Sequence, residues 1–274
     1  MHIPETPGAI SAVLVATVAA IALLACQTDA ADDVATEGEP DAEHEESAEG
    51  HEVHWSYEGD TGPAMWGSLD PSFAACHDGV RQSPVDIAGA VDGGESELEI
   101  RWQAGDAEVI DNGHTIVVNV AEGSAISLEG REFALLQFHF HHPSEHTVEG
   151  SAAPIDIHFV HAAAEGDLAV IGVFLEAGEA DPTIRSIWDA IPSAGEAPGA
   201  LAAFDPNALL PEGGSHYRYP GSLTTPGCSE IVSWVVMADS IAVSQEQVDA
   251  FAAIYPMNAR PVQPLNERTI ELKQ

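Results

Sequence analysis

Short apolar runs alternate with polar residues along most of the chain after residue 54, and Gly, Asp and Asn separate the runs. Alternation of this kind, rich in Val, Ile and Phe, predicts β-strands with one buried face. The predicted strands are 97–103, 115–121, 124–130, 133–142, 154–163, 168–177 and 230–238. Glu129 and Gly130, at the end of residues 124–130, predict a hairpin turn into residues 133–142. The pattern indicates a mainly β domain without a second linker or a repeat.

Two segments have the apolar spacing and the start signals of short helices. In residues 181–191, Asp181 is a candidate N-cap and Pro182 occupies the first helical position. In residues 244–254, Ser244 and Gln247 have the spacing of a capping box. We therefore expect a few short helices beside the strands.

The N-terminal pattern is different and predicts export. Residues 9–25 are predominantly apolar and precede Cys26, so residues 1–25 resemble a signal peptide. The stretch "LLAC" resembles a lipobox, which predicts a lipid on Cys26 and a periplasmic or cell-surface location. Cleavage without a lipid, giving a secreted protein, and an uncleaved anchor are the alternatives, since no Lys or Arg precedes the apolar core.

The distribution of charge predicts a linker after the apolar N-terminal segment and excludes some classes of partner. Residues 26–53 are acidic and nearly free of large apolar side chains, which predicts a disordered linker. The whole chain has 45 acidic and 8 basic residues, a formal charge of -37. Such a chain would repel nucleic acid and anionic lipids, so we expect membrane contact only through the N-terminus. It also suggests a saline source. No oligomeric state is predicted, and a homodimer is compatible with the sequence.

The stretch "QFHFHHPSEH" contains four of the thirteen histidines of the chain. Side chains alternate faces along a strand, so His139 and His141 share one face, about 6–7 Å apart. His142 falls on the opposite face, and His146 lies beyond Pro143. One metal ion can therefore bridge the first two histidines but not all four.

The next predicted strand offers a third ligand. If residues 154–163 pair antiparallel with 133–142, His158 can join His139 and His141. Three histidines with an open position are typical of catalytic zinc, and no Cys or Met stands nearby to favour copper. Gln137 and Asp156 could orient these ligands. Satisfied polar residues on a half-exposed sheet face remain an alternative, and so does a cupin metal site.

The cysteines fit an exported domain. With Cys26 at the mature terminus, Cys76 and Cys228 form most simply a disulfide, and the alternative is two buried thiols.

Residues 54–274 resemble the α-class carbonic anhydrases, in particular the exported bacterial ones. The resemblance rests on separated blocks in the same order: "HWSYEGDTGPAMW", "CHDGVRQSPVDI", "DNGHTI", "QFHFHHPSEHTVEG", "IDIHFVH", "GSLTTPGCSEIVSW" and "NARPVQPLNERTI". It implies a single catalytic domain on a large, central, mostly antiparallel twisted sheet. It also implies reversible hydration of carbon dioxide to bicarbonate through a zinc-bound hydroxide. The resemblance makes the cupin alternative remote.

The resemblance implies a role for each matching residue. His139, His141 and His158 match the Zn2+ ligands, and Cys76 and Cys228 match the disulfide of the bacterial members. Thr224 matches the acceptor for the hydroxide and Glu145 the acid behind it, while His114 matches the proton shuttle. The other matches are the bicarbonate neighbour Thr225, the apolar wall of Val160, Val170, Leu223 and Trp234, the ligand-supporting Gln137 and Asn258, and the water-ordering Tyr57 and Asn112.

Two residues depart from the family pattern. Asp156 stands where a Glu usually supports the third ligand, so we expect a longer contact to His158 and faster loss of zinc. Gly227 replaces a proline of the "TTPP" pattern and should loosen the turn beside Cys228. A catalytically silent relative that binds a partner is the rival interpretation. Such relatives usually lose a zinc histidine, and this chain retains all three.

Overall fold

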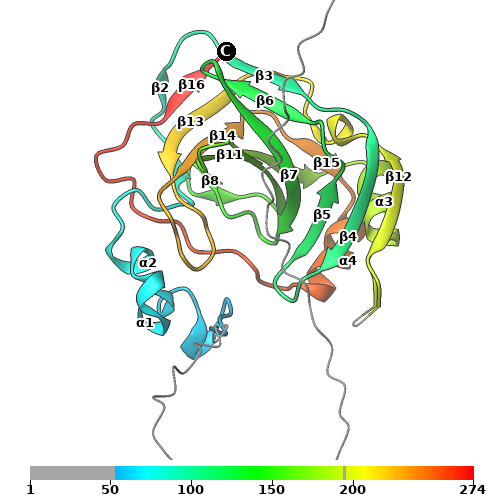
Figure 1. Ribbon diagram of the computed structural model, residues 1–274, viewed down its shortest axis with the longest axis horizontal. Helices are drawn as coiled ribbons and strands as arrows, with labels where there is room; N and C mark the ends of the chain where they lie inside the picture. Colours follow the sequence, from blue (N-terminus) through cyan, green and yellow to red (C-terminus); the bar gives the residue numbers. More distant parts are fainter. Residues whose placement is uncertain (1–52, 194–195) are drawn as a thin grey trace, which may run out of the picture. The chain divides into compact units, whose positions relative to one another are not determined.

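The computed structural model describes residues 53–193 and 196–274, and this part of the chain is mainly β (Figure 1). The predicted signal peptide and most of the predicted acidic linker lie outside the described residues. The strands are β1 (Asp86–Ile87), β2 (Val91–Asp92), β3 (Leu98–Arg101), β4 (Gly105–Asp111), β5 (Ile116–Val120), β6 (Ala125–Leu128), β7 (Arg131–His141), β8 (Thr147–Val148), β9 (Ser151–Ala152), β10 (Ile155–Ala162), β11 (Leu168–Ala177), β12 (Gly199–Phe204), β13 (His216–Gly221), β14 (Val232–Met237), β15 (Ile241–Val243) and β16 (Glu271–Lys273). Each of the seven predicted strands is present.

The helices are short, as expected. They are α1 (Trp66–Leu69), α2 (Ala75–Asp78), α3 (Pro182–Asp189) and α4 (Gln245–Ile254), with 3-10 turns η1 (Gly59–Thr61), η2 (Pro71–Phe73) and η3 (Pro206–Leu209). Asp181 caps α3 by accepting bonds from two amides, and Ser244 and Gln247 form both bonds of the capping box of α4. Both predicted helices are therefore confirmed with their caps. Among the described residues, no helix is long and apolar enough to cross a membrane.

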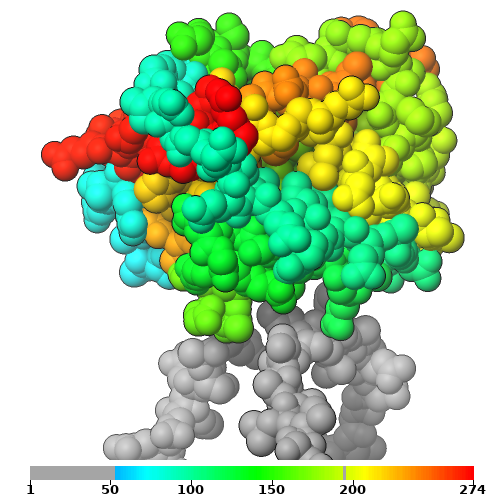
Figure 2. Space-filling model, turned by 90° about the horizontal axis from the view of Figure 1, so that it is seen from above, coloured from blue at the N-terminus to red at the C-terminus, as the bar shows by residue number. Residues whose placement is uncertain are grey.

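A large sheet forms the body of the described domain. Its strand order is β12-β4-β5-β7-β10-β11-β14-β13-β16-β2, with β3, β6 and β15 added at the side. Most neighbours are antiparallel, but β14 and β15 run parallel to β11, and β16 runs parallel to β2. Because β16 pairs with β2, the C-terminal segment lies beside the segment that contains β2. Figure 2 shows the two segments in contact at the surface. The predicted fold class is confirmed.

The turn between β6 and β7 fixes the register of the central strand. Glu129 and Gly130 both have positive φ, 52° and 75°, and Leu128 pairs with Arg131. Two such residues between strands give the tight turn whose twist matches the sheet. Because a slip of one residue would exchange the faces of β7, this turn helps to decide which side receives the histidines.

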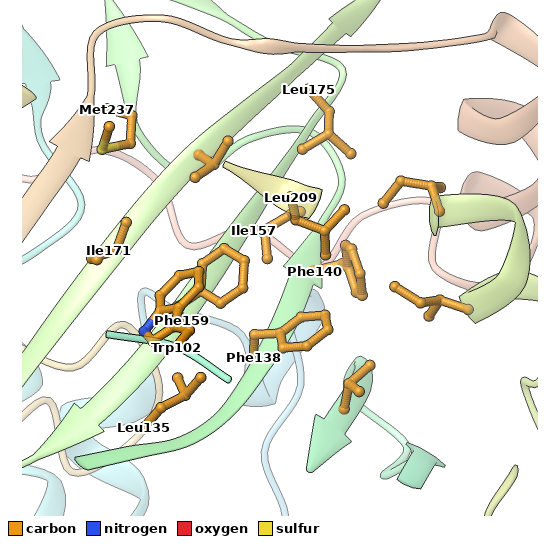
Figure 3. Packing of buried hydrophobic residues seen from close by; sticks show 14 of the residues in the cluster. Trp102, Leu135, Phe138, Phe140, Ile157, Phe159, Ile171, Leu175, Leu209 and Met237 are labelled. Carbon is orange, nitrogen blue, oxygen red and sulfur yellow. The ribbon is translucent and has the colours of Figure 1, made fainter. Parts of the chain in front are cut away.

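One face of β7 packs in the hydrophobic core, and the other face carries histidines. Phe138 and Phe140 are fully buried and face the core, where Phe138 packs against Phe159 of β10 with ring centroids 5.0 Å apart. Figure 3 shows these rings among Ile, Leu and Met side chains of the neighbouring strands. His139 and His141 project to the other face. The core therefore anchors the strand that carries two of the candidate ligands.

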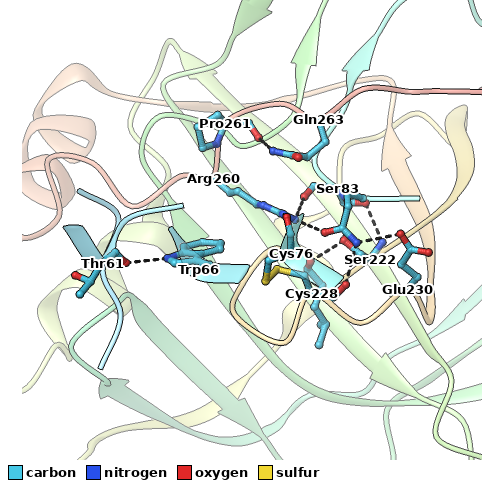
Figure 4. The surroundings of a disulfide bond; sticks show 12 residues. Thr61, Trp66, Cys76, Ser83, Ser222, Cys228, Glu230, Arg260, Pro261 and Gln263 are labelled. Atoms are coloured by element: carbon cyan, nitrogen blue, oxygen red, sulfur yellow. Dashed lines mark hydrogen bonds between the residues drawn. A yellow bond between two sulfur atoms is a disulfide. The ribbon is translucent and has the colours of Figure 1, made fainter. Parts of the chain in front are cut away.

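The disulfide between Cys76 and Cys228 is present (Figure 4). It joins α2 to the loop before β14, across a sequence separation of 152 residues. In the chain-entropy model, closing a loop of this length stabilises the fold by about 4–5 kcal/mol. The bond lies close to the loop that carries Thr224 and Thr225, so it also restricts one wall of the site.

Candidate metal centre and catalytic cavity

The sheet brings the three predicted ligand histidines together. In the register of β7 and β10, His158 lies directly opposite His139, and His141 is the next residue on the same face. The ring centroids are 4.7–5.5 Å apart, and the candidate ligand nitrogens all lie within 4.8 Å of one another. Three imidazoles at this spacing are a fitting donor set for a tetrahedral ion with one open position.

Hydrogen bonds orient two of these rings. His139 Nδ1 donates to Gln137 Oε1 at 2.9 Å, and His141 Nδ1 donates to the Asn258 carbonyl at 2.7 Å. Both Nε2 atoms are therefore left as bare acceptors, and the buried His141 Nε2 has no hydrogen bond within the described residues. Burial also lowers the pKa of His139 and His158 well below the usual value, which favours the neutral form that binds metal.

The third ring is held less well. Asp156 Oδ2 lies 3.2 Å from His158 Nε2, but no hydrogen bond of good geometry joins them among the described residues. The same oxygen accepts the Glu145 amide at 3.0 Å, so the short side chain serves two donors. The contact leaves His158 Nδ1 for a metal. The contact is therefore no longer than a hydrogen bond but has poor geometry, and faster loss of zinc stays a prediction.

Glu145 lies behind the histidines and is fully buried. Its oxygens are 3.7 and 3.8 Å from the Nδ1 atoms of His141 and His158, and Oε1 accepts the Arg260 amide at 2.8 Å. Burial raises the pKa of Glu145, while hydrogen bonding by Thr224 and by the Arg260 amide acts against that rise. Because Oε2 has no partner of good geometry in the described chain, the Thr224 contact is a loose one.

The sequence did not predict a role for Arg260, whose amide donates to Glu145 and whose side chain lies beside the disulfide (Figure 4). The guanidinium is buried and donates to Gln82 Oε1, the Ser83 carbonyl and the Cys76 carbonyl. One residue thus connects Glu145 to the disulfide segment. Arg260 is 115 residues from Glu145 in sequence, so no local pattern could have indicated the contact.

A cavity opens in front of the histidines. It is lined by all three of them together with Trp55, Tyr57, Asn112, His114, Thr115, Val117, Gln137, Val160, Val170, Leu223, Thr224, Thr225 and Trp234. All four residues of the expected apolar wall are present. Glu145, Asp156 and Asn258 lie behind the lining. Trp55, Thr115 and Val117 were missed, although the alternation of "TIVVNV" puts Thr115 and Val117 on one face.

His114 occupies the turn between β4 and β5 at the side of the cavity. Its ring stacks on Trp55 with centroids 3.8 Å apart and planes 4° apart. Asn112 Oδ1 accepts the amides of His114 and Thr115 and shapes the turn. Asn112 therefore has a structural task in addition to its place in the lining.

The other histidines of the cluster do not join the triad. His142 Nδ1 donates to the Pro256 carbonyl at 3.0 Å, near the surface. His146 Nε2 donates to the Tyr219 hydroxyl at 2.6 Å, and Tyr219 donates in turn to Ser83. Burial lowers the pKa of His146 to about 3. Both residues are polar supports, as expected from their places outside the shared face.

The comparisons with known proteins agree with this geometry. A family model described as eukaryotic-type carbonic anhydrase matches residues 61–274. The carbonic anhydrase of Pectobacterium atrosepticum is 42% identical over 220 residues, covering 80% of this chain and 90% of the relative. The carbonic anhydrase of a Nostoc species is 43% identical over 225 residues, covering 80% and 85%.

Solved structures give the same result. The α-carbonic anhydrase of Thermovibrio ammonificans, in complex with the inhibitor sulfanilamide, has a TM-score of 0.77 at 41% identity and covers 80% of this chain and 99% of that one. The α-carbonic anhydrase of Photobacterium profundum has a TM-score of 0.76 at 39% identity, covering 80% and 100%. The cupin alternative is excluded. The chain therefore belongs to the eukaryotic-type, or α-class, carbonic anhydrases, a family of carbonate dehydratases.

Proposed function

We propose that the chain catalyses the zinc-dependent, reversible hydration of carbon dioxide to bicarbonate and a proton. The observation that carries the proposal is the triad of histidines, with ligand nitrogens within 4.8 Å of one another, in the lining of a partly apolar cavity. His139, His141 and His158 would hold the ion. A bound zinc ion supplies Lewis-acid activation of water at neutral pH. The remaining chemistry belongs to the protein.

Thr224 and Glu145 would orient the attacking oxygen. A hydroxyl that donates to a carboxylate can only accept from the nucleophile, which directs a lone pair of the nucleophile toward the substrate. The Arg260 amide holds one carboxylate oxygen and leaves the other for Thr224. Thr225 would contact the bicarbonate product at the same edge of the cavity.

The apolar wall would receive carbon dioxide, which is small and uncharged. Val160, Val170 and Trp234 come from β10, β11 and β14, and Leu223 comes from the loop before β14. The Trp234 side chain is held by a hydrogen bond from Nε1 to the Ser222 carbonyl at 3.1 Å. Strand registers thus bring the wall and the histidines to the same cavity.

His114 would carry the proton out, since an imidazole titrating near neutrality suits this task. Tyr57 and Asn112 line the same cavity as His114 and the triad, where ordered water would connect His114 to the metal site. Gln137 and Asn258 would fix the ligand rings through the bonds described above.

The compartment follows from the N-terminal pattern and the disulfide. We propose export by residues 1–25 and a lipid on Cys26, with residues 26–53 as a tether. The Cys76–Cys228 bond supports an oxidising location. Membrane attachment would then occur only at the N-terminus.

Zinc analysis and a pH-indicator hydration assay on residues 50–274 test the enzymatic proposal. We expect one zinc ion per chain and rapid hydration. His139→Ala should lose both, whereas His142→Ala, an exchange within the same cluster, should keep both. A folded, zinc-loaded protein without hydration above background would instead indicate the silent relative.

A further inference from the structure

The turn that carries His114 is shaped by its own bonds but needs an anchor. Asp111 ends β4, and Asp111 Oδ1 accepts the Gly113 amide at 3.0 Å. Gly113 has a φ of 82°, a conformation that glycine adopts without strain. These bonds fix the shape of the turn, and its place over the cavity depends on the paired strands β4 and β5 and on contacts with other segments.

Two such contacts come from the segment after α4. The Tyr255 hydroxyl donates a very short hydrogen bond to the same Asp111 Oδ1. Asn258 Nδ2 donates to the His114 carbonyl at 3.1 Å. Residues 255–258 therefore hold the turn at both its start and its end.

Tyr255 is well placed to act as a rigid anchor. Its amide donates to the Phe251 carbonyl at 2.9 Å, and its ring packs against Phe251 with centroids 5.9 Å apart. Burial and the Asp111 carboxylate raise the pKa of Tyr255, so the hydroxyl remains a donor across the working range of pH. A donor to a carboxylate makes a stronger bond than a donor to a neutral group.

His114 also lies where a small movement would matter. It lines the inner cavity with the three histidines, and it lines an outer groove with Tyr255 and Pro256. Trp55 lines both hollows and stacks on the His114 ring. A group that passes protons between two hollows depends on its distance to each of them.

We propose that Tyr255 is a positioning residue for proton transfer, which holds the His114 turn in place through Asp111. Tyr255 lines the outer groove only and does not reach the cavity that contains the metal ligands. It therefore acts through His114 rather than on the substrate. The inference rests on the proposed function and adds a residue that the family motifs do not include.

Stopped-flow hydration of carbon dioxide by the full, zinc-loaded chain tests it with Tyr255→Phe. We expect kcat at low buffer to fall about 3- to 10-fold, because a displaced shuttle transfers protons more slowly. The ratio kcat/KM, which reports hydration itself, should not change, and added imidazole should restore kcat. Tyr217→Phe removes a hydroxyl that makes no hydrogen bond within the described residues and should leave every parameter unchanged.

The double variant Tyr255→Phe with His114→Ala separates positioning from general damage. If Tyr255 acts through His114, the double variant should match His114→Ala alone. Asp111→Ala removes the same bond from its other end and also the bond from the Gly113 amide, so it should lower kcat at low buffer at least as much as Tyr255→Phe does. A further loss in the double variant, or an unchanged kcat in Tyr255→Phe, would overturn the inference. An inactive wild-type chain that holds zinc would instead contradict the proposed function.

Discussion

At the scale of single residues, buried His161 couples the fold to pH. Trp102 Nε1 donates to His161 Nε2 at 3.1 Å, so Nε2 carries no proton and Nδ1 donates to the Ala169 carbonyl. Burial lowers the pKa of His161 from 6.5 to about 4. The unfolded chain therefore binds a proton that the folded chain does not, over this range of pH.

Stability should consequently be lost as pH falls from about 6.5 toward 4, by up to about 3 kcal/mol from this group. Urea unfolding at several pH values measures the loss. In His161→Gln the slope against pH should be shallower than in the wild type, while His77→Gln, at an exposed site, should keep the wild-type slope. Equal slopes in all three proteins would contradict the assignment.

Asp156 is the second residue whose effect can be predicted. Asp156→Glu adds the methylene that the misaligned contact with His158 lacks, so we expect zinc to dissociate about 10-fold more slowly. Transfer of zinc to a chelator measures this rate. Asp156→Asn, which keeps the length and removes the charge, should instead release zinc faster. An unchanged or faster rate in Asp156→Glu would mean that the contact does not limit zinc retention.

At the scale of elements, the turn after Thr225 has a conformation of its own. Gly227 has a φ of 95°, whereas proline is restricted to about −65°. A proline at this position would therefore require a different turn, and a looser turn beside Cys228 stays a prediction. The Cys228 amide donates to the Thr225 carbonyl at 2.9 Å and closes the turn.

Gly227→Pro should therefore destabilise the protein by about 2–4 kcal/mol and reduce hydration, although the "TTPP" pattern of the resemblance has a proline here. Gly227→Ala should cost about 1–2 kcal/mol. Gly214→Ala is the matched control, since an added Cβ there meets no atom within 4 Å. Urea unfolding provides the free energies. A stable and fully active Gly227→Pro would show that the turn can change its shape freely.

The sequence predicts the elements that depend on local patterns, but not the pairing of strands that are distant in sequence. Alternation in β7 and β10 predicts the faces of His139, His141 and His158, because period 2 is a local property of the chain. The hairpin at Glu129 and the two capped helices are local as well. The parallel pairing of β14 with β11 joins residues that are distant in sequence, and no periodicity reveals it.

Several elements give too weak a local signal. The strands β1, β2, β8 and β9 have two residues each, too few for alternation to be recognised. In β4 the exposed face carries Asp and Glu, which have low β propensity, and β13 is interrupted by Pro220. In the site, Arg260 contacts Glu145 and Tyr255 contacts Asp111 across 115 and 144 residues of sequence, so no local pattern indicates these contacts. The resemblance to a family supplied roles for residues such as Thr224 that periodicity alone leaves as ordinary turn residues.

At the scale of the whole molecule, charge is the dominant feature. With 45 acidic and 8 basic residues, most carboxylates have no cationic partner. The ion pairs of Arg101 and Arg131, each with two acids, lie on the surface and contribute little. Repulsion among the remaining acids should oppose folding until salt screens it.

We therefore expect the free energy of unfolding in urea to rise by about 1–3 kcal/mol between 0.05 and 1 M NaCl. Most of the gain should appear below about 0.5 M, because the screening length is already short there. Exclusion of salt from the surface would instead give a gain that continues linearly to 3 M. Replacing several exposed acids with Gln should reduce the low-salt part only. Equal stability in low and high salt would contradict adaptation to a saline environment. It would mean that repulsion among the acidic residues does not destabilise the fold.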